Sequence, residues 1–357
     1  MEEMDEMVNP DMVVLARESR GLSQSELAKH LHVTQGKISK IEHGILGVSP
    51  EMLEQLIEEL KYPEQFFYQK FQVFPAEMHF YRRHKTLSAK KQVEILAMMN
   101  IRRKHIKILL DDAEIEFRPL PECDLENYNN SPEDVARAVR HYLRLPRGPI
   151  QNMTKILEDA GVIVIHLDVG TRLFSGASMH AEKPNFIIFV NKDMPGDRLR
   201  FTLAHELGHI IMHRLPTANM EEEADRFASE FLMPAREIAQ YLSNLALDKL
   251  AVLKKYWKVS MAAILKQAQN LKQISQRQYE YLWTQMGKAG YRLNEPPELA
   301  IPQEKPSLIG ELVELHLKEL GYTVDQLSDK LAYRAEEFAS VYLIPNRHLK
   351  LLQQRAG

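Results

Sequence analysis

The stretch FTLAHELGHIIMH, residues 201–213, constrains the fold of this chain more than any other segment. It places His205 and His209 four residues apart, with Glu206 between them, in an apolar run that predicts a helix over about 197–214. Residues i and i+4 share one face of a helix, so both imidazoles can reach one metal ion. Glu206 lies about 100° round the helix, where it can act on a water molecule at that ion as a general base. We therefore expect a zinc site of the H-E-x-x-H kind, the alternative being an apolar core helix that merely contains histidines.

The third ligand of this zinc site must come from another segment, because a catalytic zinc normally has three protein ligands and one open position. His213 lies eight residues beyond His205, about 12 Å along a helix, and is too distant to share the ion. The next predicted helix opens with EEEAD at residue 221. We predict Glu221 as the third ligand, since Asp225 on the same face can hold the outer nitrogen of a ligand histidine. Glu222 is the alternative, and an acidic first turn that only complements the helix dipole is the simpler interpretation.

The rest of the pattern predicts a multidomain, mainly α chain. Its 357 residues are enough for several modules. Three apolar runs, around 161–169, 174–180 and 185–191, predict a small sheet before the histidine-bearing helix, which makes the central domain α+β. We expect a helix-turn-helix domain over 1–70, a basic connecting helix and linker over 71–130, a metallopeptidase domain over 131–291, a proline-rich linker over 292–306 and a helical C-terminal module over 307–357.

Residues 80–118 predict one long helix with a strongly basic part. Between residues 81 and 107, nine Lys/Arg side chains stand against one acidic residue, Glu94. This part can supply phosphate affinity, or it can be a solvated or interdomain face.

A helix-turn-helix is predicted from residue 23 to residue 44. Ser23 and Glu26 form a capping box before one helix, and Thr34 caps a second helix that Gly44 ends. We expect the N-terminal part of the second helix to meet base edges and the start of the first to meet phosphates. The predicted DNA-contacting residues are Ser23, Gln24, Thr34, Gln35, Lys37, Ser39 and Lys40. Residues 10–70 hold nine acidic and seven basic side chains, so a small helical interaction module is the alternative.

A second copy of the helix-turn-helix pattern occurs near the C-terminus. Residues 21–42 align without a gap to residues 321–342, and the apolar positions coincide. Glu336 and Glu337 stand where the first copy has Gly36 and Lys37. The hypothesis is a degenerate helix-turn-helix that binds protein rather than phosphate, and the alternative is any two amphipathic helices joined by a tight turn.

Two resemblances follow from these motifs. RFTLAHELGHIIMH, followed by E-x-x-A-D-R-F-A-S-E-F-L-M-P, resembles the ImmA/IrrE-type metallopeptidases, and the likeness extends over about 141–236 and more loosely to 290. This resemblance implies one zinc ion per chain, held by His205, His209 and Glu221, with Glu206 as catalytic base. It also implies site-specific cleavage of a regulatory protein, typically a repressor or an antitoxin. Residues 11–68 resemble phage-repressor-like (Xre-type) DNA-binding domains.

Composition narrows the setting in which such a protein works. A net charge of −3 excludes a globally basic nucleic-acid coat protein but leaves room for a small DNA-reading module. Cys123 is the single cysteine, so no internal disulfide can form, which fits a reducing compartment. The acidic start MEEMDEM is unlike a signal peptide, and the apolar runs are too short to span a bilayer. We expect a cytoplasmic protein.

These expectations combine into a zinc-dependent endopeptidase that binds double-stranded operator DNA and cleaves a repressor or antitoxin. The competing hypothesis is a non-enzymatic Xre-type regulator or antitoxin whose C-terminal domain senses a ligand or a metal. A sensor has no need of Glu206, which favours the enzyme. Paired half-sites are usual for helix-turn-helix readers, so a homodimer is also possible.

Overall fold

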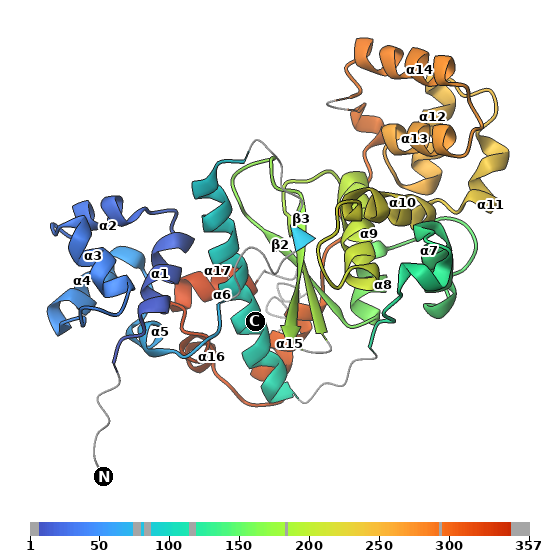
Figure 1. Ribbon diagram of the computed structural model, residues 1–357. Helices are drawn as coiled ribbons and strands as arrows, with labels where there is room; N and C mark the ends of the chain where they lie inside the picture. The colour runs from blue at the N-terminus through green and yellow to red at the C-terminus, as the bar shows by residue number, and fades with distance from the viewer. Residues whose placement is uncertain are drawn as a thin grey trace, which may run out of the picture. The chain divides into compact units, whose positions relative to one another are not determined.

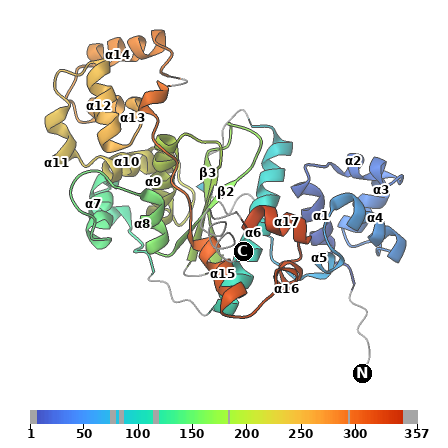
Figure 2. The same ribbon diagram turned by 180° about the vertical axis from the view of Figure 1, so that it is seen from behind.

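The structure is a computed structural model that describes residues 7–73, 80–81, 87–113, 119–182, 185–292 and 295–343 (Figures 1 and 2). The chain forms two compact units. Unit 1 comprises Met1–Ala76, Thr86–Ile115 and Leu308–Gly357, and unit 2 comprises Glu77–Lys85 and Glu116–Ser307. The division into five consecutive domains stays a prediction, and segments from both ends of the chain share unit 1. Among the described helices, none has the length and apolar composition needed to cross a membrane.

Unit 1 begins with the predicted helix-turn-helix. Ser23 and Thr34 accept hydrogen bonds from the backbone N–H groups of Glu26 and Lys37, so each caps the start of its helix. Leu27 and Ile38 are fully buried between the helices. The helices are α1 (Pro10–Ser19), α2 (Gln24–His30), α3 (Gln35–Glu42), α4 (Pro50–Leu60) and α5 (Glu64–Tyr68).

The long basic helix is shorter than expected. Helix α6 spans Ala89–Ala113, and Ser88 accepts a hydrogen bond from the N–H of Lys91 at its start. The prediction of one helix from residue 80 is wrong at its beginning, because Phe80–Tyr81 form strand β1 of unit 2. Residues 82–86 and 114–118 of that prediction lie outside the described residues.

The C-terminal module belongs to unit 1. Its helices are α15 (Leu308–Lys318), α16 (Val324–Lys330) and α17 (Ala335–Tyr342), and residues 344–357 of the prediction lie outside the described part of the chain. Leu327, Leu331 and Phe338 share one buried cluster with Leu27 and Ile38 of the N-terminal helices. Apolar burial therefore joins the two ends of the chain in one core.

Unit 2 is built round a four-stranded sheet in the order β1-β3-β4-β2. Strands β2 (Val162–Leu167) and β4 (Asn185–Asn191) run parallel, and β3 (Gly176–Glu182) is antiparallel to β4 and to β1. The helices of this unit are α7 (Pro132–Tyr142), α8 (Met153–Asp159), α9 (Gly196–Met212), α10 (Met220–Leu232), α11 (Ala235–Ile238), α12 (Leu247–Trp257), α13 (Met261–Asn270) and α14 (Gln276–Lys288). A mainly α chain with a small sheet in its central domain is thus confirmed.

Helices α9 and α10 lie side by side, as both views show (Figures 1 and 2). Helix α9 also contacts strands β3 and β4, while α10 is covered by α7. Almost every side chain of α9 is buried, including its charged and histidine residues. A helix buried on all sides between a sheet and other helices holds its side chains rigidly, which suits a metal centre.

The segment predicted as a proline-rich linker lies along unit 2. Glu304 pairs with the buried guanidinium of Arg200, and the side chain of Gln303 donates to the backbone carbonyl of Lys192. A Cβ atom on Gly196, at the start of α9, would collide with the carbonyl oxygens of Ile301 and Pro302. Residues 295–307 therefore form a strap against the beginning of α9.

Candidate metal centre

Helix α9 carries three chemically active side chains on adjoining turns. His205, Glu206 and His209 are only 1%, 1% and 0% exposed. Their burial is costly unless each polar atom finds a partner, so the groups round them decide what the site can do.

Helix α10 brings a carboxylate to the two imidazoles. The Nε2 atoms of His205 and His209 lie 3.6 and 3.4 Å from the carboxylate oxygens of Glu221. Gly208 makes this approach possible, because a Cβ there would lie 3.1 Å from the ring of Phe227 on α10. In the part of the chain that the structure describes, His205, His209 and Glu221 are the group whose ligand atoms converge closely enough for one metal ion.

The outer nitrogens of both imidazoles are engaged. Nδ1 of His205 donates to Asp225 over 2.8 Å, because a carboxylate can only accept. Nε2 of His213 likewise donates to Glu223 over 3.0 Å, which leaves its Nδ1 to accept from Nδ1 of His209 at 2.9 Å. Burial lowers the pKa of His209 and of His213, in keeping with neutral rings.

This arrangement fits a metal ion. With both Nδ1 atoms donating outward, the Nε2 lone pairs of His205 and His209 face each other across 3.0 Å, beside the carboxylate of Glu221. Lone pairs at that distance repel unless a cation lies between them. Two histidines and one glutamate are a usual protein ligand set for catalytic zinc.

Without a metal, a proton on His205 supplies the positive charge between these groups. Burial lowers the pKa of His205, but hydrogen bonds to Asp225 and Glu221 outweigh it and raise this pKa to about 9. The same contacts with His205 and His209 hold the pKa of Glu221 far below its usual range. The centre is therefore a cation site by its own charge distribution.

The carboxylate of Glu206 is held from the sheet. The hydroxyl of Ser178 on β3 donates to Glu206 over 2.9 Å, and Ser178 itself is buried. On its other side, β3 pairs with β1, where Phe80 lies opposite Ser178 and Tyr81 opposite Ala177. A strand of the chain's own backbone thus lies along the edge of β3, next to the residue that holds Glu206.

The structure brings the predicted metal ligands close to one another. His205, His209 and Glu221 converge, Asp225 binds the outer nitrogen of His205, and Glu222 is not in the converging group. These assignments of function stay predictions. The geometry agrees with leaving His213 out of the ligand set.

The sequence did not predict three hydrogen-bond partners of the centre. These are His213 as partner of His209, Glu223 as partner of His213, and Ser178 as partner of Glu206. The spacing of four residues between His209 and His213 was a usable signal for the first. Ser178 gave no local signal, because its position depends on how a distant strand packs against α9. Arg200 is fully buried and bonded to Glu304 and to the carbonyl of Ile150, so it is a structural residue.

The predicted DNA-reading face is open in unit 1. Gln35 and Lys40 are exposed, and Gln35 donates to the side chain of Gln24 over 2.7 Å. Gln24 in turn donates to Glu42, which also pairs with the buried Arg17 of α1. Lys37 and Ser39 are partly exposed on the same helix. Contacts of these residues, and of Ser23 and Thr34, with DNA stay predictions.

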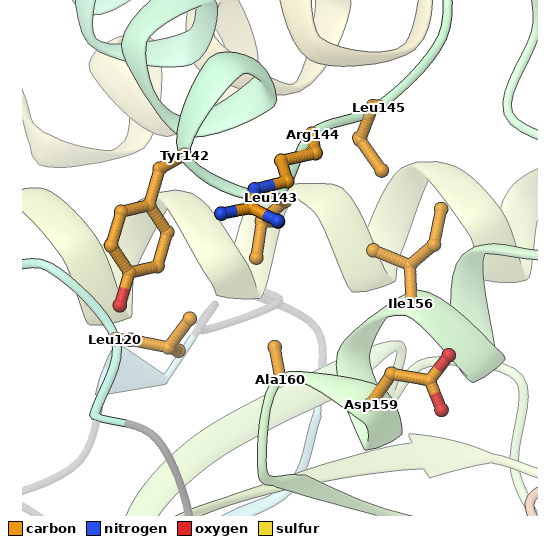
Figure 3. Close-up of a pocket in the computed structure, with 8 residues that line it drawn as sticks. All are labelled: Leu120, Tyr142, Leu143, Arg144, Leu145, Ile156, Asp159 and Ala160. Atoms are coloured by element: carbon orange, nitrogen blue, oxygen red, sulfur yellow. The ribbon is translucent and has the colours of Figure 1, made fainter.

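A hollow in unit 2 lies apart from the metal centre. It lies between the end of α7 and α8 (Figure 3) and is lined by Leu120, Tyr142, Leu143, Arg144, Leu145, Ile156, Asp159 and Ala160. None of the candidate metal ligands lines it, so the chemistry described above does not take place there.

Comparison with known families agrees with both parts of the chain. Residues 157–269 match the Peptidase M78 family model, described as the IrrE N-terminal-like domain. Residues 15–67 match a family model described as helix-turn-helix. No curated protein matches the chain. The first match covers strands β2, β3 and β4 with helices α9 and α10, and it leaves out β1. The second match covers the second half of α1, all of α2 to α4 and most of α5.

Proposed function

The chain joins an IrrE-type metallopeptidase domain to an N-terminal helix-turn-helix DNA-binding domain, and we propose that it is a zinc-dependent endopeptidase that cleaves a transcriptional repressor or an antitoxin. The observation that carries this proposal is the convergence of His205, His209 and Glu221 beside the buried Glu206. A site that only senses a metal has no use for a carboxylate next to its ligands, whereas a hydrolase needs a base there.

His205, His209 and Glu221 are the residues that would hold the zinc ion. When bound, zinc supplies a Lewis acid that makes water nucleophilic near neutral pH. Glu206 takes the proton from the attacking water and later returns it to the leaving amine. The Ser178 hydroxyl orients that carboxylate. Asp225 and His213 fix the ring orientations of the two histidines from outside.

The substrate segment would be an extended strand. Ser178 contacts Glu206 and lies on the edge of β3 that pairs with β1. A peptide can add to such an edge through its backbone hydrogen bonds, which places its peptide groups next to the catalytic base. Phe80 and Tyr81 occupy part of this edge, so substrate binding there requires that β1 give way.

The N-terminal domain would place the peptidase at an operator. Lys37 and Lys40 would meet phosphates or guanine, and Gln35 would read a base edge. Cleavage of a repressor bound nearby then changes transcription at that site. Double-stranded DNA and a protein substrate are thus the proposed partners.

The test is Glu206→Gln, which keeps shape and hydrogen-bonding atoms but removes the base. We expect this variant to keep zinc and DNA binding while it loses at least about a hundredfold in the rate at which it cleaves its repressor or antitoxin substrate. Zinc content by atomic absorption and DNA binding by anisotropy serve as controls. If regulation in cells survives Glu206→Gln, the protein acts as a non-enzymatic regulator instead.

A further inference from the structure

One three-helix pattern occurs twice in unit 1. Helices α16 and α17 begin and end 300 positions after α2 and α3. Ser23 and Thr323 both form capping boxes with the third residue of their helices. His32 and Ala332, in the two turns, have left-handed φ values of 54° and 52°. Such agreement in caps, turn and lengths goes beyond two amphipathic helices.

The buried positions of the two copies also agree. Leu27 and Leu327 are fully buried, as are Ile38 and Phe338. Helix α15 precedes α16 as α1 precedes α2, and α15 contacts both α16 and α17. The described residues 308–343 thus have the helices and the core of a second helix-turn-helix domain.

The second helix of the second copy, α17, contacts protein instead of facing solvent at position 337. Glu337 stands where the first copy has Lys37, and its carboxylate accepts two hydrogen bonds, of 2.9 and 3.1 Å, from Arg20, the residue that follows α1. Arg334 stands where Thr34 caps α3, and it donates to the carbonyl of Ile57 on α4 over 2.9 Å.

Aromatic residues extend this contact. Tyr333, in the turn, is buried with its ring centroid 6.0 Å from that of Tyr62. The guanidinium of Arg20 lies 4.3 Å from the centre of the same Tyr62 ring. At the end of α17, the Tyr342 hydroxyl lies 2.8 Å from Nδ1 of His105 on α6. The turn is thus covered by protein at Tyr333, and α17 contacts the N-terminal helices through Glu337 and Tyr342, while Ala335, Glu336 and Ser340 stay exposed.

We propose that residues 308–343 form a second helix-turn-helix domain. Its second helix, α17, binds the N-terminal helix-turn-helix domain on the face made by Arg20, Tyr62 and the end of α4. Glu336 and Glu337 would repel phosphate, which excludes this copy from DNA. Each chain therefore carries one DNA-reading helix-turn-helix and one that serves as its permanent partner.

Equivalent substitutions in the two copies test this proposal. Lys37→Gln should weaken binding of a fluorescein-labelled duplex of about 20 base pairs and reduce the salt slope by about one, with α16 and α17 as protected from amide exchange as before. Glu337→Gln should do the opposite: duplex binding stays unchanged, while amides of α16 and α17 exchange about fivefold faster. If Glu337→Gln weakens duplex binding as Lys37→Gln does, the second copy reads DNA and the proposal fails.

A charge exchange separates a specific contact from general damage. Arg20→Glu and Glu337→Arg should each accelerate exchange in α16 and α17, and the double variant should recover most of the protection. Amides of β2 and β4 in unit 2 serve as the folding control. No recovery in the double variant overturns the contact. Protection that falls on dilution would show that the partner is a second chain, which also overturns the proposal.

Discussion

The Nδ1 atom of His209, on the last turn of α9, lies 2.9 Å from Nδ1 of His213, the residue directly after that helix. Since Nε2 of His213 donates to Glu223, the proton between the two rings belongs to His209. This leaves Nε2 of His209 as a lone pair that points to Glu221. His213 thus sets the tautomer of a metal ligand without being a ligand itself.

His213→Leu should lower zinc affinity by about 10- to 100-fold without removing a ligand, because Nδ1 of His209 loses its acceptor. Glu223→Gln should give a smaller loss, since the amide can still accept from Nε2 of His213. Competition with a chromophoric chelator measures both affinities. An unchanged zinc affinity in His213→Leu would mean that the hydrogen bond between His209 and His213 does not contribute to zinc binding.

Glu221→Ala should cost more than the loss of His213, because one of three ligands disappears. We expect zinc to be absent from the purified Glu221→Ala protein. Glu222→Ala is the matched control, since it removes the neighbouring carboxylate outside the converging group, and it should retain one zinc per chain. If the Glu222→Ala protein is metal-free and the Glu221→Ala protein retains one zinc per chain, the third ligand is Glu222 and not Glu221.

Local patterns made part of this centre predictable. The spacing of His205 and His209 fixes their common helix face, and the acidic start of the next helix offered Glu221. Ser178 and strand β1 depend on which strand packs against α9 and in what register, and such long-range pairing leaves no periodicity to read. The contact between Glu337 of α17 and Arg20 is equally non-local. The expected helix from residue 80 failed for the same reason, because pairing with β3 overrides the local pattern there.

Removal of β1 should open the edge of β3 to substrate. Phe80→Pro combined with Tyr81→Pro deletes both backbone N–H groups of this strand and should disrupt its pairing. We expect β3 amides to exchange faster and KM for the cleaved repressor or antitoxin to fall a few-fold, with little change in kcat. Phe80→Thr with Tyr81→Val keeps the N–H groups and the strand propensity, and should behave as the wild type. If the proline variant has a higher KM instead, β1 assists substrate binding.

The contact between the strap and α9 should be essential to unit 2. Arg200 is 0% exposed, and Glu304 of the strap is its charged partner. Glu304→Ala leaves a buried charge without compensation and should lower the free energy of unfolding by about 3–5 kcal/mol. Arg200→Met combined with Glu304→Leu removes both charges and should recover much of this loss. Urea denaturation of the variants followed by circular dichroism gives the comparison, and a small effect of Glu304→Ala alone would show that the strap contributes little.

Lys104 gives unit 1 a pH dependence of its own. Its ammonium group is buried near the rings of Phe66 and Phe71, at 5.6 and 5.8 Å, and burial lowers its pKa to about 7. The unfolded chain keeps this proton up to about pH 10.5. Between pH 7 and 10.5 the unfolded state therefore binds more protons than the folded state, so stability rises with pH in this window.

Lys104→Met removes the buried charge and should stabilise unit 1 by on the order of 2 kcal/mol at pH 7. The advantage should shrink as the pH rises towards 10, because the wild-type lysine is then increasingly neutral in the unfolded chain too. Thermal unfolding of both proteins at pH 6, 7, 8, 9 and 10 measures the difference. Lys29→Met, at an exposed position of α2, is the control and should show no such trend. A Lys104→Met protein that is less stable than the wild type at pH 7 would mean that the contact with the two rings outweighs the cost of burial.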